Sequence, residues 1–158
     1  MVRESTPRRL CGTIGLIAAL AVAVSAPGPF AVEKHDYRSE MYCNAGFVLY
    51  RDSRLEEAAA YLRKAIRINP RYSKANKYMG LVMSRMNRNA EAVEYFRVAL
   101  ERKPDSRFIN YYLGVHLLEM NNTAEGISYL KKSSRLAEDA RDHFMAARIR
   151  ELLERYSR

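Results

Sequence analysis

Residues 73–106 read SKANKYMGLVMSRMNRNAEAVEYFRVALERKPDS, and a related pattern stands once before and once after this stretch. The three copies begin at positions 39, 73 and 107, so they lie 34 residues apart. Self-similarity at a fixed period of this length is typical of repeat architectures, in which each copy is one supersecondary unit. The spacing therefore predicts the fold before any single helix is assigned.

Equivalent places in the three copies hold identical residues or residues of one chemical class. Glycine, glutamate, tyrosine and a small residue recur at Gly46, Gly80 and Gly114, at Glu57, Glu91 and Glu125, at Tyr61, Tyr95 and Tyr129, and at Ala58, Ala92 and Gly126. Pro70 and Pro104 end the first two copies, whereas Glu138 stands at the third place. Identities and class matches at one spacing indicate true structural repeats.

Each copy has the pattern of an antiparallel helical hairpin. Two apolar periodic segments of about a dozen residues flank a short polar break. The breaks carry Ser53, Asn87 and Asn121, which cap helices or tolerate a left-handed turn. Glycine inside a first helix costs up to about 1 kcal/mol relative to alanine. Its recurrence therefore predicts a close approach of the second helix, which we expect at the small residues Ala58, Ala92 and Gly126.

The predicted helices span residues 39–51, 54–68, 73–86, 89–102, 107–120, 123–136 and 139–156. In the last of them, Met145, Ile149, Leu152 and Tyr156 recur at helical spacing on one side. Because the end of a repeat array exposes apolar surface, this amphipathic segment is predicted to cap the third hairpin.

The repeat resembles the tetratricopeptide-repeat family, whose unit has 34 residues with small residues and a closing proline at these places. The resemblance covers about residues 39–140. It implies an all-α, right-handed α-solenoid of three hairpins at 39–72, 73–106 and 107–138, with a capping helix at 139–158. Asn76 and Asn110 depart from the family pattern, because an aromatic residue is expected there.

The first residues differ in composition from the rest. Arg3, Arg8 and Arg9 precede an uncharged apolar stretch at 10–26 that ends in small residues, and Pro27 follows. This pattern predicts that residues 1–26 are a signal peptide or an N-terminal membrane anchor, with a linker at 27–38. Either reading places the repeats on the far side of a membrane, in a periplasmic or other extracytoplasmic location.

The chain is basic, with a formal net charge of +9. Residues 27–158 keep 24 basic and 17 acidic residues, which leaves a net charge of +7. Such a charge steers acidic partners toward the protein. The basic residues form no focused cluster interleaved with aromatic residues, which argues against nucleic acid. Membrane contact is expected only through the N-terminal segment.

No catalytic, cofactor or metal site is predicted. His35, His116 and His143 are isolated, and no cysteine or carboxylate stands at a metal-binding spacing from them. The sequence contains no glycine-rich phosphate loop, nucleophile elbow or zincin motif. These absences disfavour an enzyme.

The resemblance also implies a binding site, because first helices of the family line a concave face that binds peptides. Carried over by register, this face would contain Phe47, Tyr50, Lys74, Lys77, Leu81, Arg85, Phe108, Tyr111, Val115 and Leu118, with Cys43 beside them. The family's clamp for heat-shock chaperone C-termini needs a lysine and an asparagine where this chain has Cys43 and Phe47, so that function is not expected. The face predicts a peptide partner that is acidic and has apolar anchors.

Two functions remain open. The first is an exported or membrane-tethered adaptor, monomeric or weakly oligomeric, that organises an envelope assembly such as a secretion, pilus or cytochrome-maturation apparatus. The second is a structural module that self-assembles by stacking hairpins between chains. Aromatic anchors beside lysines suit a peptide ligand and favour the first.

Overall fold

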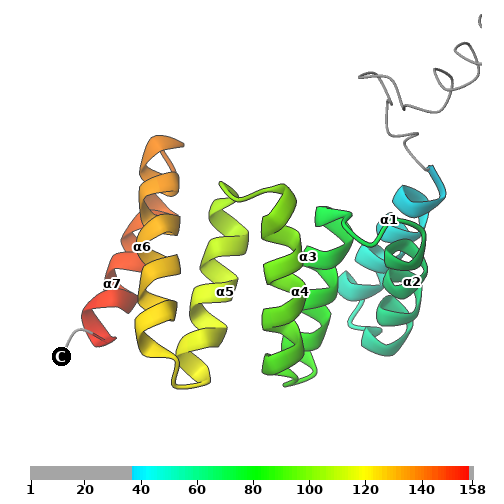
Figure 1. Cartoon of the computed structure of the whole chain (residues 1–158), viewed down its shortest axis with the longest axis horizontal. Coiled ribbons are helices and arrows are strands. Elements are labelled where there is room, and N and C mark those ends of the chain that lie inside the picture. Colours follow the sequence, from blue (N-terminus) through cyan, green and yellow to red (C-terminus); the bar gives the residue numbers. More distant parts are fainter. Residues whose placement is uncertain (1–36, 157–158) are drawn as a thin grey trace, which may run out of the picture. The chain divides into compact units, whose positions relative to one another are not determined.

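The computed structural model describes residues 37–156. Every regular element in this part of the chain is an α-helix, and the helices follow one another in chain order (Figure 1). They are α1 (Tyr37–Arg51), α2 (Leu55–Ile68), α3 (Ser73–Arg85), α4 (Asn89–Arg102), α5 (Arg107–Glu119), α6 (Thr123–Asp139) and α7 (His143–Tyr156). The predicted all-α class and the succession of three hairpins are confirmed. No helix within 37–156 is both long and apolar enough to cross a membrane.

The boundaries differ from the predicted ones at both ends of the array. Helix α1 begins at Tyr37, so the last two residues of the predicted linker belong to it. Helix α6 continues to Asp139, and α7 begins only at His143. The predicted signal peptide or anchor at 1–26, and the rest of the linker, lie outside the described residues.

The turn inside each hairpin has one geometry. Ser53, Asn87 and Asn121 have φ angles of 61°, 59° and 62°, which lie in the left-handed region that serine rarely and asparagine more readily adopts. The next residue donates its backbone N–H to a carbonyl five residues back, as Arg54 does to Leu49 at 2.9 Å. These bonds form the Schellman motif, which satisfies the last carbonyls of the first helix. The prediction of a left-handed turn at these polar breaks is confirmed.

The links between hairpins are longer and contain Pro70 and Pro104. The side-chain amide of Asn110 donates to the carbonyls of Pro104 at 3.0 Å and Ser106 at 2.9 Å. Asn76 donates in the same way to the carbonyls of Pro70 and Tyr72. Both asparagines are therefore buried turn-holding residues, which explains why an amide replaces the aromatic residue that the family pattern has there.

First and second helices approach closely at the recurring glycines. A Cβ atom placed on Gly80 would lie 2.6 Å from Cε1 of Phe96, and one placed on Gly46 would lie 2.6 Å from Cγ of Leu62. A Cβ atom on Gly114 would lie 2.8 Å from Cγ of Leu130. The predicted close approach is confirmed, and the carbonyl oxygens of Ala58 and Gly126 lie 3.2 Å and 2.9 Å from the Cβ positions of Gly46 and Gly114. At Gly80 the ring of Phe96 is nearest, a large side chain that the prediction of Ala92 did not include.

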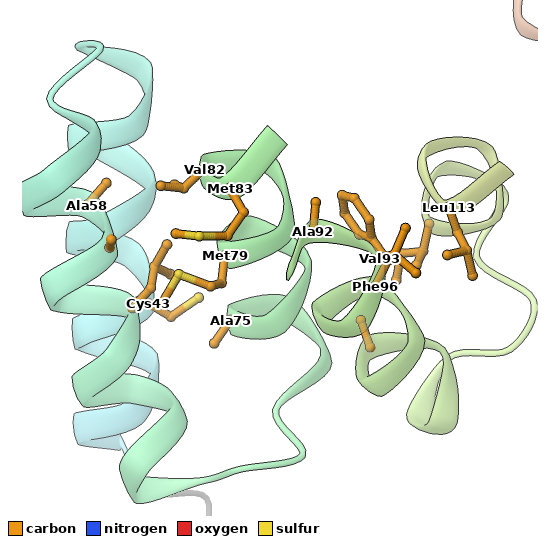
Figure 2. Packing of buried hydrophobic residues seen from close by; sticks show 14 of the residues in the cluster. Cys43, Ala58, Ala75, Met79, Val82, Met83, Ala92, Val93, Phe96 and Leu113 are labelled. Atoms are coloured by element: carbon orange, nitrogen blue, oxygen red, sulfur yellow. The ribbon is translucent and has the colours of Figure 1, made fainter. Parts of the chain in front are cut away.

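The core consists of two clusters of buried apolar side chains, a larger one from α1 to α5 and a smaller one that joins α5, α6 and α7. Figure 2 shows Cys43, Met79 and Met83 in the larger cluster where α3 meets the first hairpin, and Phe96 where α4 turns toward α5. Hydroxyl groups join neighbouring elements inside the same layer: Ser73 Oγ donates to the carbonyl of Ala99 at 2.8 Å, and Ser39 Oγ donates to that of Ala65 at 3.1 Å. In the first two hairpins a hydroxyl of the first helix is thus tied to the backbone of the second helix, and in the third Ser133 Oγ of α6 donates to the carbonyl of Arg107 at 2.7 Å.

Helix α7 is reached through the same turn that closes each hairpin. Arg141 has a φ angle of 56°, and Asp142 donates its N–H to the carbonyl of Ala137 at 2.8 Å. Because Glu138 replaces the third proline, α6 continues and ends in a Schellman turn. Helix α7 therefore packs on α6 as a hairpin partner, with Ala146 and Ile149 fully buried. The predicted capping role is consistent with this packing, although Tyr156 remains 42% exposed.

Replacing Gly80 by leucine should destabilise the array by about 1–3 kcal/mol or more, because overpacking forces a close contact apart. The ring of Phe96 has little room to yield, since it is stacked on Tyr112 at 5.7 Å and on His116 at 5.9 Å. Thermal unfolding followed by circular dichroism measures the loss. The matched control is Ala60→Leu on the exposed side of α2, which should stay within about 0.5 kcal/mol of the unmodified chain. Equal effects of the two changes would contradict the proposed close contact.

Candidate functional site

The repeat places the predicted binding residues on one side of the first helices. Phe47, Leu81 and Val115 are equivalent residues of α1, α3 and α5, and each directly follows the glycine that meets the second helix. Lys74 and Phe108 are equivalent, as are Lys77 and Tyr111. We call the surface formed by these residues together with Tyr50 and Arg85 the first-helix face. All of them are half-buried or exposed, so their side chains reach the surface.

Direct contacts join α1 and α3 on this face. The rings of Phe47 and Tyr78 stack with centroids 4.5 Å apart and planes 22° apart. Lys74 Nζ donates to Oδ1 of Asn44 at 2.9 Å. At the other end of the same helices, Arg85 Nη1 donates to the backbone carbonyl of Tyr50 at 3.1 Å. The structure thus brings together the residues predicted from the first two copies.

Cations on the first-helix face lie against aromatic rings. Lys77 Nζ is 4.4 Å from the ring centroid of Tyr78, and Arg85 Cζ is 4.4 Å from that of Tyr50. Burial lowers the pKa of the Lys77 ammonium from its ordinary value, because desolvation disfavours the charged form. This packing of basic residues on aromatic rings was missed in the sequence: Lys77 and Tyr78 are neighbours in α3, whereas Arg85 and Tyr50 belong to different helices.

No carboxylate among residues 37–156 lies within 4 Å of Lys74, Lys77 or Arg85. Two arginines at α4 differ. Arg88 pairs with Glu91 at the start of α4, and Arg97 of α4 pairs with Glu125 of α6 at 2.9 Å. The positive charge of the first-helix face is therefore available to a ligand.

Two predicted residues do not reach the surface. Cys43 is fully buried, under the side chains of the first two hairpins, although Lys77 and Tyr111 at the equivalent places reach the surface. Leu118 is only 4% exposed, because α7 covers this part of α5 and brings Ile149 into the same cluster. Both residues belong to the core, so their assignment to the binding face was wrong.

The first-helix face continues into a hollow of about 200 Å³ between α5 and α7. We call it the α5–α7 hollow, and it is lined by Phe108, Tyr111, Tyr112, Asp142, Phe144, Met145 and Arg148. The Arg148 guanidinium lies over the ring of Tyr111, with Cζ 5.9 Å from the centroid. Phe144 is 82% exposed and Phe108 is 46% exposed. The sequence predicted Phe108 and Tyr111 but missed Phe144 and Arg148, which lie off the apolar stripe of α7.

Electrostatics connects the hollow to the first hairpin. Burial raises the pKa of the Tyr112 hydroxyl, nearby Tyr50 and Tyr111 raise it further, and Arg148 opposes them. Side chains of α1, α5 and α7 therefore lie within electrostatic reach of one ring. The two parts of the face share Phe108 and Tyr111, which also line the hollow.

The described surface has two further hollows. One of about 360 Å³ is lined by Lys131, Ser134, Arg135, Glu138 and Leu153. A second hollow of about 340 Å³ lies beside α4 and contains Glu91, Glu94 and Arg97, whose charges already pair with one another or with neighbours. Within residues 37–156, no three histidine, cysteine or acidic side chains gather as a metal site would require.

Comparison with known proteins agrees with the repeat pattern. Residues 39–72 and 79–141 match two models of the tetratricopeptide repeat. No curated protein matches the chain.

Similar solved structures share the fold at low identity. The type III secretion translocator chaperone SycD of Yersinia enterocolitica is 16% identical with a TM-score of 0.70, over 77% of this chain and 92% of that one. PcrH of Pseudomonas aeruginosa, solved with the chaperone-binding region of PopD, is 13% identical with a TM-score of 0.69, over 75% and 90%. YrrB, described as a protein with an unusual peptide-binding site, is 21% identical with a TM-score of 0.63, over 72% and 57%.

The burial of Cys43 makes its thiol unreactive in the folded protein. Burial raises the pKa of Cys43 from 9.0 to about 11, so at pH 8 about one thiol in a thousand is ionised, against about one in ten at the ordinary value. Alkylation by iodoacetamide should be at least about 50-fold slower in the native chain than in denaturant, as measured by mass spectrometry of the peptide that contains Cys43.

The same pKa sets a stability trend with pH. Since the folded-state pKa of Cys43 lies above the unfolded one, the contribution of its neutral thiol to the free energy of unfolding is complete below about pH 9 and is lost as the pH rises toward about 11.

In the alkylation experiment, rapid reaction of the native chain at pH 8 would contradict the buried position of Cys43.

Proposed function

Because the chain belongs to the tetratricopeptide-repeat family, we propose that it is a non-enzymatic protein-interaction adaptor that binds an acidic peptide with apolar anchors on its first-helix face. One observation carries this proposal. Lys74, Lys77 and Arg85 have no carboxylate partner among the described residues, and two of them lie against aromatic rings. A ligand carboxylate would complete the interactions of these cations.

The arrangement suits peptide recognition for physical reasons. A guanidinium stacked on a ring keeps its N–H groups in one plane, where they can donate to a carboxylate. The ring beneath it offers apolar area at low conformational cost, since an aromatic side chain has only two rotatable bonds. Charges of this kind govern encounter, whereas buried aromatic anchors govern release.

The comparisons support a peptide ligand without naming it. SycD and PcrH are described as secretion chaperones or as bound to a partner's chaperone-binding region, and YrrB as having a peptide-binding site. We extend the proposal to location: the basic start and the apolar stretch at 10–26 favour an adaptor exported to, or tethered in, the cell envelope, where it organises an assembly.

The ends of the array favour self-assembly as a second candidate function. On α1, Tyr37 is 79% exposed and Met41 and Val48 are each 56% exposed, and on α7 Phe144 is 82% exposed. Apolar residues at both ends would suit stacking between chains. The positive charge opposes it, because like-charged copies repel one another. A stable oligomer in sedimentation velocity would favour this second function, and a monomer would favour the adaptor.

Reversing Lys74 and Lys77 to glutamate should slow association with a partner by about ten-fold or more at low ionic strength, and it should flatten the salt dependence. The partner is first captured by crosslinking to the full chain, and the rates are measured by surface plasmon resonance. Tyr111→Ala should mainly hasten dissociation. The matched control is Arg63→Glu with Lys131→Glu, the same charge change on exposed second-helix residues.

Thermal unfolding of each variant separates a lost contact from a lost fold. If the control variant slows association as much as Lys74→Glu with Lys77→Glu does, the first-helix face is the wrong surface.

Export has a separate test. A reporter enzyme that is active only outside the cytoplasm, fused after residue 158, should be active in cells that express the full chain. The same fusion with Leu16, Ile17 and Leu20 changed to arginine should be inactive, because charges in the apolar stretch oppose insertion. Equal activity of the two fusions, or an active cytoplasmic reporter in their place, would contradict the proposed location.

A further inference from the structure

We propose that the α5–α7 hollow holds the principal apolar side chain of the peptide, of leucine to phenylalanine size, and that Arg148 pairs with a carboxylate beside that side chain. The inference rests on the proposed function, because the hollow lies at the α7 end of the first-helix face. It specifies which part of the peptide the hollow holds, an apolar side chain, and it adds Arg148 of α7, which the repeat register does not include.

The size of the hollow limits its occupant. A cavity of about 150 Å³ lined by apolar side chains is known to take one benzene molecule. The hollow of about 200 Å³ therefore has room for one phenyl or branched aliphatic group. Aromatic rings stand on both sides of it, Phe108 and Tyr111 on α5 and Phe144 on α7.

The exposed rings of Phe108 and Phe144 leave apolar surface for a ligand to cover. Phe144 is 82% exposed although it lies on the helix that caps the array. A cap needs apolar residues only on its inner side, where Ala146 and Ile149 are buried. Phe144 contributes nothing to that inner side, and it gains apolar contact only when a ligand enters the hollow.

The charges around the hollow favour an acidic neighbour of the anchor. Asp142 is already engaged at both oxygens: Oδ1 accepts from the N–H of Met145 at 3.1 Å, and Oδ2 accepts from Arg107 Nε at 3.3 Å. Arg148 has no carboxylate within 4 Å in the described part of the chain. Two guanidinium groups against one carboxylate leave a single positive charge, which a ligand carboxylate would neutralise.

The same charges disfavour other occupants. A single-stranded nucleic acid needs cations that track its backbone, whereas the hollow has one uncompensated guanidinium and a carboxylate beside it. A second copy of the chain would bring its own net positive charge to a positive surface. An acidic peptide gains from the charge of the hollow and from its apolar walls.

The test uses a defined probe and the full chain. The probe is a fluorescein-labelled dodecapeptide with one central phenylalanine flanked by glutamates, and binding is followed by fluorescence anisotropy. Two matched probes carry serine for the phenylalanine, or glutamine for the glutamates. The first probe should bind more tightly than either matched probe by about five-fold or more.

Variants on α7 locate the binding. Phe144→Ala should weaken the first probe by about five-fold or more, and the serine probe should be insensitive to this change. Arg148→Gln should weaken the first probe and leave the glutamine probe unaffected. Because both side chains are exposed, neither change should alter thermal unfolding. The matched controls Tyr156→Ala and Arg150→Gln lie on α7 outside the hollow and should change binding less than two-fold.

Each other result overturns the inference in a distinguishable way. If Lys74→Glu with Lys77→Glu weakens the probe while Phe144→Ala and Arg148→Gln do not, the hollow is not the anchor site and the proposed function stands. If no probe binds saturably, both fail. If Phe144→Ala instead dissociates an oligomer in sedimentation velocity, a second copy occupies the hollow. If a single-stranded oligonucleotide displaces the probe and shows the same sensitivity to Phe144→Ala, the occupant is nucleic acid.

Discussion

In each hairpin a glycine of the first helix lies directly under a large side chain of the second helix: Leu62 on Gly46, Phe96 on Gly80 and Leu130 on Gly114. A Cβ atom at any of these glycines would come within 3 Å of that side chain, so the pair of helices can approach this closely only where the first helix has no side chain. Because the contact recurs every 34 residues, it fixes the rotation of each first helix about its own axis. As a result, equivalent residues of the three first helices face the same way in each copy.

The binding face is a consequence of that fixed rotation. Since each glycine faces the second helix, the residue after it lies about 100° further around the first helix. Phe47, Leu81 and Val115 all reach the surface there. Neighbouring first helices then bring side chains from different copies into contact, as Phe47 stacks on Tyr78. On this side Lys77 and Arg85 rest on rings and have no carboxylate partner among the described residues, while Arg88 and Arg97 at α4 pair with carboxylates. Lys64 of α2 also lies over rings, those of Tyr42 and Tyr61, so contact with rings alone does not distinguish the two faces.

The repeats, the hairpins and the residues of the left-handed turns could be predicted because each depends on local chemistry at a fixed spacing. Burial of individual face residues could not, because it depends on which neighbour lies above them. Cys43 occupies the same register as Lys77, but its short side chain lies beneath longer neighbours. Leu118 is covered by α7, whose position depends on a turn that the sequence did not reveal. The interleaving of cations and rings was missed for a similar reason, since Arg85 and Tyr50 are 35 residues apart.

The end of the array shows how one turn changes what a cap can do. A third proline would have stopped α6 and started another link between hairpins, as Pro70 and Pro104 do. With Glu138 in its place, Arg141 adopts the left-handed conformation and Asp142 accepts the N–H of Met145 at the start of α7. Asp142 also accepts a bond from Arg107 at the start of α5, so the first turns of α5 and α7 are held side by side. Phe144 and Arg148 follow Asp142 within two turns and therefore lie beside Phe108 and Tyr111. The loop between α6 and α7 thus has two effects. It places the inner side of α7 over the core, and it places the first two helical turns of α7 where they complete the hollow on the binding face.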